Sequence, residues 1–193
     1  GSDRILRQMK RGHTAYDYKQ KIRRLRELRP DISMSSDFIV GFPGETEAEW
    51  AETLDFCRRA QFGHIHIFAF SPRAGTKAAT LGDQIDRDTQ RQRSQQLHEL
   101  AQHSRRATLQ AALGRLAPVL FEGRDTRADG TPVWHGYTPN YLRVEVATPH
   151  GLDLDNQIHT VELTAPSADG TTLEGRLRNV TPSPSRQTAG VSP

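Results

Sequence analysis

Hydrophobic and polar positions recur with helical spacing in three stretches of the first 113 residues. One predicted helix opens at the capping box of residues 14–17 and ends at Pro30. A second helix opens at the capping box of residues 46–49, and a long third helix spans about residues 86–112. The positions that these helices should turn inward are Tyr18, Ile22, Leu25, Leu28, Trp50, Thr53, Leu54, Cys57, Leu97, Leu100, Ser104 and either Ala107 or Thr108.

Two short runs between these helices have the character of strands. Residues 31–40 become apolar toward their end, and residues 64–70 alternate between apolar and polar positions. The order helix, strand, helix, strand, helix predicts an α/β fold with a parallel sheet. Two parallel strands cannot close a barrel, so we expect this part to belong to a larger α/β domain.

The pattern changes after Gly114, where short β-rich runs are separated by Gly, Pro, Asp and Asn. The runs are residues 119–122, 141–146, 158–163 and 173–177. Several short strands at this spacing predict a small all-β barrel of OB-like size. The Pro- and Ser-rich residues 181–193 predict a disordered tail.

Composition narrows the class of protein. The chain has 193 residues, of which 35% are hydrophobic and 25% are charged. No run approaches the roughly 18 apolar residues of a membrane span, and no secretory signal is evident. The only cysteine, Cys57, excludes an internal disulfide and any iron–sulfur or zinc site built from this chain's own cysteines. A reducing, cytoplasmic location is therefore expected.

Charge is uneven along the chain. Residues 1–30 carry ten Lys or Arg and three Asp or Glu, whereas residues 31–60 carry two and seven. The basic block could meet a polyanion such as RNA. An exposed, arginine-rich helix face accounts for the same pattern equally well.

The sharpest local feature is the Gly- and Pro-rich turn within residues 37–46, between a strand and a helix start. Gly41 and Gly44 let the backbone approach a ligand closely. Acidic residues at the helix start disfavour phosphate and suit ribose hydroxyls or a cationic ligand. The alternative is a structural turn whose carboxylates complement the helix dipole.

Other candidate groups are weaker. Arg73, in the loop after the second strand, could pair with a carboxylate or phosphate, or could be an ordinary surface arginine. His64 and His66 have a spacing that could chelate a metal, but no third ligand is evident, which favours lining residues. Cys57 on an apolar helix face is interpreted as a buried, inert thiol. In the β-rich part, Trp134 and two tyrosines mix with Arg143, as on OB-like surfaces that stack on nucleotides.

Three segments in order, residues 1–14, 37–46 and 70–76, resemble the radical-SAM methylthiotransferases. Enzymes of this family attach a methylthio group to an unactivated carbon of tRNA or of a ribosomal protein. The resemblance implies the late part of a radical-SAM (βα) barrel over residues 1–80 and a connecting helix over 81–113. It further implies a TRAM-like β-barrel over 114–180 that holds RNA.

Two segments, residues 66–73 and 136–144, look most like the branch that acts on threonylcarbamoyladenosine beside the tRNA anticodon. The expected function is therefore transfer of a methylthio group to C2 of that nucleoside by radical S-adenosylmethionine chemistry. The isopentenyladenosine branch is the alternative.

The resemblance also implies sites and partners. The residues expected to line the S-adenosylmethionine site are Ser2, Asp37, Gly41, Pro43, Gly44, Glu45, Ser71 and Arg73. Those expected to contact RNA are Tyr137, Tyr141 and Arg143. The expected partners are the tRNA anticodon stem-loop and a missing N-terminal half that carries the [4Fe–4S] clusters. No membrane is expected to be a partner.

The chain departs from the family pattern because it has no CxxxCxxC motif. We therefore expect it to ligate no cluster and to be inactive alone, as a C-terminal fragment of such an enzyme. Two other hypotheses remain open. One is a stand-alone RNA-binding module, and the other is an iron-free βα-barrel enzyme that binds an adenosyl or sugar ligand.

Overall fold

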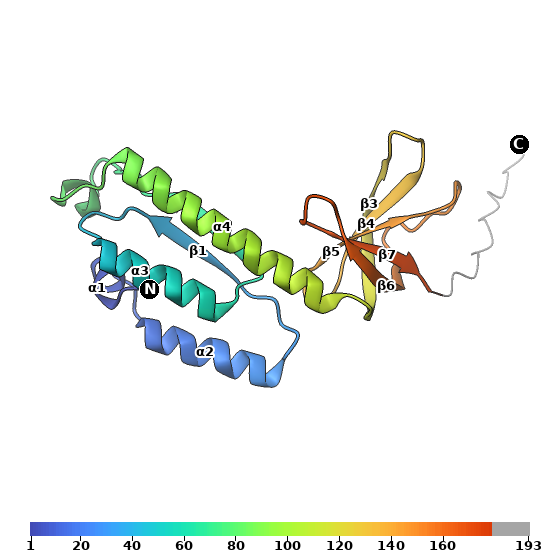
Figure 1. Cartoon of the computed structure of the whole chain (residues 1–193), viewed down its shortest axis with the longest axis horizontal. Helices are drawn as coiled ribbons and strands as arrows, with labels where there is room; N and C mark the ends of the chain where they lie inside the picture. The colour runs from blue at the N-terminus through green and yellow to red at the C-terminus, as the bar shows by residue number, and fades with distance from the viewer. Residues whose placement is uncertain (179–193) are drawn as a thin grey trace, which may run out of the picture. The chain divides into compact units, whose positions relative to one another are not determined.

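The computed structural model describes residues 1–178 (Figure 1). These residues form two compact units. The first comprises Gly1–Ala111 and Ala168–Thr171, and the second comprises Ala112–Ser167 and, among the described residues, 172–178. Within residues 1–178, no helix is both long and apolar enough to cross a membrane. The tail predicted over 181–193 lies outside the described residues.

The first unit alternates helices and strands, as the sequence predicts. Its elements are α1 (Asp3–Gln8), α2 (Ala15–Leu28), β1 (Ser35–Val40), α3 (Glu47–Ala60), β2 (His64–Ala69), the 3-10 helix η1 (Lys77–Thr80) and α4 (Arg87–Ala112). The strands β1 and β2 are parallel, with Ser35 opposite His64 and Val40 opposite Ala69. The α/β prediction is confirmed, although β1 begins later than expected and α1 was not predicted.

The starts of α2 and α3 follow from capping boxes. The Thr14 hydroxyl accepts a hydrogen bond from the Asp17 amide, while the Asp17 carboxylate accepts one from the Thr14 amide. Thr46 and Glu49 make the same reciprocal pair at the start of α3. Each box satisfies amides that the first helical turn leaves without partners.

Helices α2, α3 and α4 contribute to one core with the two strands. The buried residues of this core are Ile22, Val40, Trp50, Phe56, Cys57, Ala60, Phe62, Ile65 and Leu97. The Trp50 indole donates to the Gln96 side chain at 2.6 Å, so its polar atom is satisfied. On α4, Thr108 is half-buried whereas Ala107 is exposed, which decides between the two predicted positions.

The predicted apolar face of α2 is wrong at its C-terminal end. Leu25 and Leu28 are 44% and 62% exposed. The side of α2 that is buried carries Ile22, and Arg26 one turn later donates to the carbonyls of Ala60 and Gln61. Helical geometry then turns Leu25 and Leu28 away from the core.

The two faces of the small sheet differ. Side chains alternate between the two faces along each strand. Val40 of β1 and Ile65 of β2 enter the core, and the residues next to them in each strand face the other side. That other side carries Asp37, Ile39 and Phe68, of which Ile39 is 39% and Phe68 53% exposed. The first unit therefore leaves these two apolar side chains partly exposed.

The second unit is a closed five-stranded barrel with the strand order β3-β4-β5-β7-β6. Its strands are β3 (Leu116–Thr126), β4 (Pro132–Tyr137), β5 (Arg143–Ala147), β6 (Ile158–Pro166) and β7 (Leu173–Leu177). The predicted small all-β barrel is confirmed. The sequence missed β4 because Pro132 and Gly136 argue against a strand. In the barrel, Gly136 is required because an added Cβ would lie 2.4 Å from the Leu120 carbonyl oxygen.

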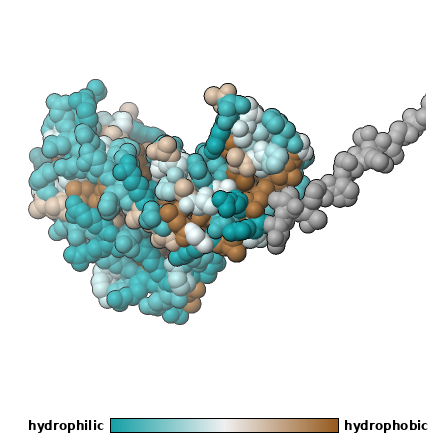
Figure 2. All heavy atoms as spheres, turned by 45° about the vertical axis from the view of Figure 1, so that its right-hand side comes forward, coloured by the Kyte–Doolittle hydropathy of each residue, from teal (hydrophilic) through white to brown (hydrophobic). Residues whose placement is uncertain are grey.

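The face of the molecule drawn in Figure 2 is mostly hydrophilic. Figure 2 shows teal residues over most of the visible face, with hydrophobic residues confined to limited patches. The low mean hydropathy of −0.68 is therefore expressed at the surface, while the apolar residues are concentrated in the cores of the two units.

Candidate functional site

A cleft of about 1460 Å³ lies in the first unit, along the face of β1 that the helices leave open. Its lining includes Asp37 and Ile39 of β1 and Phe42, directly after that strand. It continues past the end of β2 to Phe70 and Ser71. The cleft thus reaches the carboxyl ends of both parallel strands, where ligands of α/β proteins bind.

Five of the eight residues predicted to bind the cofactor line this cleft, namely Ser2, Asp37, Glu45, Ser71 and Arg73. Gly41, Pro43 and Gly44 are not among the lining residues. The five come from the N-terminus, from β1, from the turn after β1 and from the loop after β2. The structure therefore brings together residues that are up to 71 positions apart in the sequence.

The three residues Asp37, Ser71 and Arg73 present polar side chains to the cleft. All three are exposed, and in the part of the chain that the structure describes their side chains make no hydrogen bond or ion pair. A carboxylate, a hydroxyl and a guanidinium are thus free to contact a ligand. The carboxylate and the hydroxyl can accept hydrogen bonds from ribose hydroxyls or an ammonium, and the guanidinium can pair with a carboxylate.

The turn after β1 packs on α4, which explains why its glycines lie outside the cleft lining. Gly41 has φ +77°, and a Cβ there would lie 2.5 Å from the side chain of Gln90. The Gln90 amide reaches the carbonyls of Gly41 at 3.4 Å and Phe70 at 3.5 Å, so one side chain of α4 links the ends of both strands. Gly44 also has a positive φ, and its amide donates to the Asp83 carbonyl at 2.8 Å.

Glu45 is held by a buried ion pair. Nη1 of Arg93 on α4 lies 3.0 Å from Oε2 of Glu45, and the two side chains are 4% and 5% exposed. Arg93 also donates to the Glu45 carbonyl and to the Glu47 carboxylate. Burial raises the pKa of Glu45, while the charge of Arg93 opposes that shift. Although Glu45 lines the cleft, its carboxylate is engaged in fixing the turn to α4.

Ser2 is also engaged within the protein. Its hydroxyl donates to Glu49 Oε1 at 2.9 Å and accepts from the Ile5 amide as the N-cap of α1. Arg4 makes hydrogen bonds of 2.6 Å to both oxygens of Glu49. These bonds, with that from Arg4 as the largest cause, lower the pKa of Glu49. The Ser2 hydroxyl predicted to lie near a ribose is thus a structural cap at the margin of the cleft.

Sequence reasoning missed Gln90 and Arg93, which position the turn. A signal was present, because both lie one or two turns before Leu97 on the inward stripe of α4. A charged residue on an otherwise buried stripe needs a buried partner. The acidic residues at the start of α3 supply that partner here.

The histidines and the cysteine do not form a metal site. The rings of His64 and His66 are 4.3 Å apart, and Nδ1 of His64 contacts the guanidinium of Arg105. Burial, followed by the charge of Arg105, lowers the pKa of His64. Cys57 is fully buried, and burial raises its pKa to about 12. Over residues 1–178, no cluster of three or more His, Cys, Asp or Glu could hold a metal ion.

These residues do not fit an iron–sulfur cluster. A cluster is held by several thiolates, whereas this chain has one thiol, protonated and enclosed by apolar side chains. An adenosyl ligand fits better, because the open cleft offers free polar groups beside the aromatic rings of Phe42 and Phe70.

The three residues predicted to contact RNA lie together in the second unit. Tyr137 ends β4 and is the register partner of Arg143 on β5. Tyr141, in the turn between these strands, is 81% exposed, and its ring lies 5.5 Å from that of Tyr137. Trp134 is instead buried in the barrel and donates to the Leu152 carbonyl. Two tyrosine rings and a guanidinium thus form one exposed cluster.

Comparison with known proteins gives matches over most of the chain. Residues 1–57 match the Radical SAM superfamily. Three relatives carry the name tRNA-2-methylthio-N(6)-dimethylallyladenosine synthase. That of Sphingopyxis alaskensis is 42% identical over 82% of this chain, that of Maricaulis maris 41% over 92%, and that of Chromohalobacter salexigens 38% over 96%.

The chain spans only 35%, 37% and 40% of the length of these three relatives. The matches support a methylthiotransferase family, as the sequence motifs implied. They do not support the threonylcarbamoyladenosine branch. The names of the relatives favour the isopentenyladenosine alternative, since dimethylallyl and isopentenyl denote the same adenosine substituent.

Proposed function

We propose that this chain is the C-terminal part of a radical-SAM tRNA methylthiotransferase that acts on N6-dimethylallyladenosine. The observation that carries the proposal is the cleft at the carboxyl ends of β1 and β2, with Asp37, Ser71 and Arg73 free in its wall. The motifs around these residues are those through which the chain resembles the family, and the relatives carry the name of this activity.

In this proposal the cleft holds S-adenosylmethionine, which when bound would supply the adenosyl radical on receiving an electron from an iron–sulfur cluster, while a second S-adenosylmethionine would supply the methyl group. Asp37 accepts hydrogen bonds from the ligand, and Arg73 closes the site from the loop after β2. Gln90 and Arg93 keep the two strand ends in place from α4. The iron–sulfur clusters belong to the part of the enzyme that this chain does not include, because Cys57 cannot ligate them.

That further part of the enzyme is proposed to complete the barrel against the open face of the small sheet. The exposed side chains of Ile39 and Phe68 favour a protein partner there, since a sheet of parallel strands is normally covered on both faces. The second unit is proposed to be a TRAM-like domain that binds the anticodon stem-loop. Its exposed tyrosine pair beside Arg143 suits base stacking and a phosphate contact.

The test is complementation with the full-length enzyme. In a strain that lacks it, mass spectrometry of tRNA nucleosides should show dimethylallyladenosine without its methylthio group, while methylthiolated threonylcarbamoyladenosine persists. The wild-type gene should restore the product, whereas Asp37→Asn should lower it at least about 10-fold, the loss of one charge-assisted contact of about 1.4 kcal/mol. Glu99→Gln, on the exposed side of α4, is the matched control.

The alternative outcomes are distinct. If the deletion strain instead lacks methylthiolated threonylcarbamoyladenosine, the substrate is threonylcarbamoyladenosine and not dimethylallyladenosine. Full activity of the Asp37→Asn enzyme would remove the cleft from the proposal. A stand-alone RNA-binding module, favoured by the tyrosine cluster, would leave both nucleosides unchanged in the deletion strain.

A further inference from the structure

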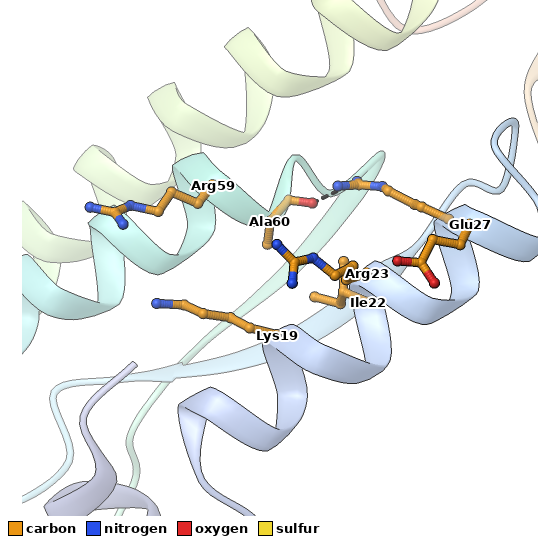
Figure 3. A pocket seen from close by; sticks show the side chains of 7 residues that line it. Lys19, Ile22, Arg23, Glu27, Arg59 and Ala60 are labelled. Carbon is orange, nitrogen blue, oxygen red and sulfur yellow. Dashed lines mark hydrogen bonds between the residues drawn. The ribbon is translucent and has the colours of Figure 1, made fainter.

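A second concave surface lies on the first unit, between α2 and α3. This α2–α3 groove has a volume of about 440 Å³ (Figure 3). It is lined by Lys19, Ile22, Arg23, Arg26, Glu27, Arg59 and Ala60. Ile22 and Ala60 are buried and form its floor, while the charged residues form its rim. None of these residues lines the cleft described above.

The rim of the groove is strongly basic. Four cationic side chains and a single carboxylate line it. That carboxylate, Glu27, pairs with Arg24 on α2 at 3.2 Å, and Arg24 is not a groove residue. Asp55 of α3 pairs with Arg59 at 2.9 Å, in an ion pair whose arginine side chain is 71% exposed. An exposed ion pair of this kind contributes little to stability, so Arg59 can exchange Asp55 for another anion.

Two of the cations have no acidic partner. In the described residues, neither Lys19 nor Arg23 forms an ion pair, and Figure 3 shows both side chains extending from α2 beside Ala60. The ammonium of Lys19 lies 5.6 Å from the ring centroid of Phe56, which holds the lysine at the groove. Both positive charges are therefore available to an external anion.

A third cation is fixed in place. Nη2 of Arg26 donates to the Ala60 carbonyl at 2.6 Å and to the Gln61 carbonyl at 2.9 Å. These bonds cap the C-terminus of α3 and leave other guanidinium donors of Arg26 on the groove side, since it has five. Its position is thus set before any ligand binds, which lowers the entropic cost of binding.

The arrangement suits a chain of anions better than a single ion. Lys19, Arg23 and Arg26 follow one another at helical spacings of four and three residues, so that neighbours are about 5–6 Å apart along α2. A row of separated charges along an open groove matches successive phosphates of a nucleic-acid backbone. Arginine in particular pairs with phosphate through two parallel hydrogen bonds.

We propose that the α2–α3 groove binds the phosphate backbone of RNA. The inference rests on the proposed function, in which tRNA is the substrate, and adds a contact surface outside both the cleft and the tyrosine cluster. An acidic protein segment is the competing class of ligand. RNA is favoured because the proposed substrate is itself a polyanion, and because the groove offers a row of cations with little apolar surface above its floor.

The experiment measures tRNA binding by the 193-residue chain at a series of KCl concentrations. The triple variant Lys19→Gln/Arg23→Gln/Arg59→Gln should bind more weakly, and the slope of log K against log salt should decrease by about 2–3, at about 0.7–0.9 per lost phosphate contact. Arg26 is retained because it caps α3. The matched control Arg87→Gln/Arg91→Gln/Arg106→Gln removes the same charge from exposed positions outside the groove and should keep the wild-type slope.

The outcomes separate the possible failures. If the wild-type chain does not bind tRNA, both the groove and the proposed role of this chain in RNA binding are rejected. If wild type binds and both triple variants lose affinity equally, or neither does, only the groove proposal is overturned. If polyglutamate of equal charge displaces tRNA from wild type but not from the groove variant, the acidic-protein alternative replaces it. The single variant Arg23→Gln, expected to lower the slope by about 0.7–0.9, keeps the test valid if the triple variant unfolds.

Discussion

The buried ion pair between Arg93 and Glu45 fixes the turn after β1, which borders the cleft, to α4. Replacing Arg93 by Met should destabilise the first unit by about 3–5 kcal/mol, because Glu45 would remain buried without its cation. Urea unfolding followed by circular dichroism measures the change. The control is Glu47→Gln, which removes the partner whose side chain is 76% exposed and should cost no more than about 1 kcal/mol.

A double variant separates charge burial from lost packing. Arg93→Met/Glu45→Gln removes both charges and should recover a large part of the stability lost in Arg93→Met alone. If the double variant is as unstable as the single one, then the guanidinium of Arg93 over the Trp50 ring, rather than its ion pair with Glu45, holds the turn.

The Cys57 thiol gives a pH-dependent prediction. In the folded protein its pKa is raised to about 12, whereas the unfolded thiol titrates near 9.0. Above pH 9 the unfolded state binds fewer protons than the folded state, so stability must fall as pH rises. The expected loss from this group is about 1.4 kcal/mol between pH 8 and pH 10.

Comparison with a variant that lacks the thiol isolates this effect. Cys57→Ala should show a shallower decline of the free energy of unfolding over the same pH range, whatever its absolute stability. Equal pH slopes for the two proteins would mean that the thiol ionises in the folded state, contrary to its burial in the helical core.

Individual residues also show what sequence patterns can and cannot predict. Asp37, Ser71 and Arg73 were predicted as cofactor-binding residues from the family resemblance, and they do share one cleft. The Ser2 hydroxyl and the Glu45 carboxylate are instead bound by Glu49 and Arg93, which are 47 and 48 residues away. The sequence around Ser2 and Glu45 does not show that these side chains are engaged, although the place of Arg93 on the inward stripe of α4 indicates that this arginine needs a buried partner.

At the scale of elements, the capping box of α3 combines a helix start with the margin of the cleft. Glu49 accepts hydrogen bonds from Arg4, Ser2 and Thr46, which lower its pKa below the ordinary 4.5. The resulting stability is fully present above pH 4.5 and is lost as pH falls and the carboxylate becomes protonated.

Glu49→Gln should therefore unfold at lower urea concentration than wild type at pH 7, and the difference should shrink as the pH is lowered below 4.5. Unfolding midpoints between pH 7 and pH 3 measure this. Glu52→Gln, an exposed position on the same helix, should follow the wild-type curve. A difference that stays constant with pH would assign the effect to the altered side chain and not to its charge.

Elements were predictable where local chemistry decides them. The starts of α2 and α3 could be predicted because each capping box joins residues only three positions apart. The exposure of Leu25 and the existence of β4 depend instead on neighbours. Leu25 faces outward because Arg26 takes the contact with α3, and Gly136 sits in a strand because β3 passes close to it.

At the scale of the whole molecule, the open face of the β1–β2 sheet was predictable from strand number alone. Two parallel strands need further strands and a second cover, and Ile39 and Phe68 are indeed exposed on that face. For the second unit, the sequence predicted a small all-β barrel but not the order of its five strands. That order depends on the parallel pairing of β5 with β7, which no local pattern indicates.

The whole chain also makes a prediction about metal. Anaerobic reconstitution with iron and sulfide should leave the purified chain with far less than the roughly four irons per protein of a [4Fe–4S] cluster, and without a charge-transfer absorption band. The reason is the ligand set, because a single thiol with a pKa of about 12 lies inside the core. Iron and acid-labile sulfide assays measure the outcome, with Cys57→Ala as the control for adventitious binding.

The two possible results lead to different accounts of the molecule. Residual iron that is equal in the wild-type chain and in Cys57→Ala fits the proposal that the iron–sulfur clusters are held by a part of the enzyme outside this chain. Stoichiometric iron that is lost in Cys57→Ala would require the core around Trp50 and Phe56 to open, since Cys57 has no exposed surface. That opening would have to appear as reactivity of Cys57 toward a thiol reagent before iron is added, and this makes thiol labelling of the native chain the decisive companion measurement.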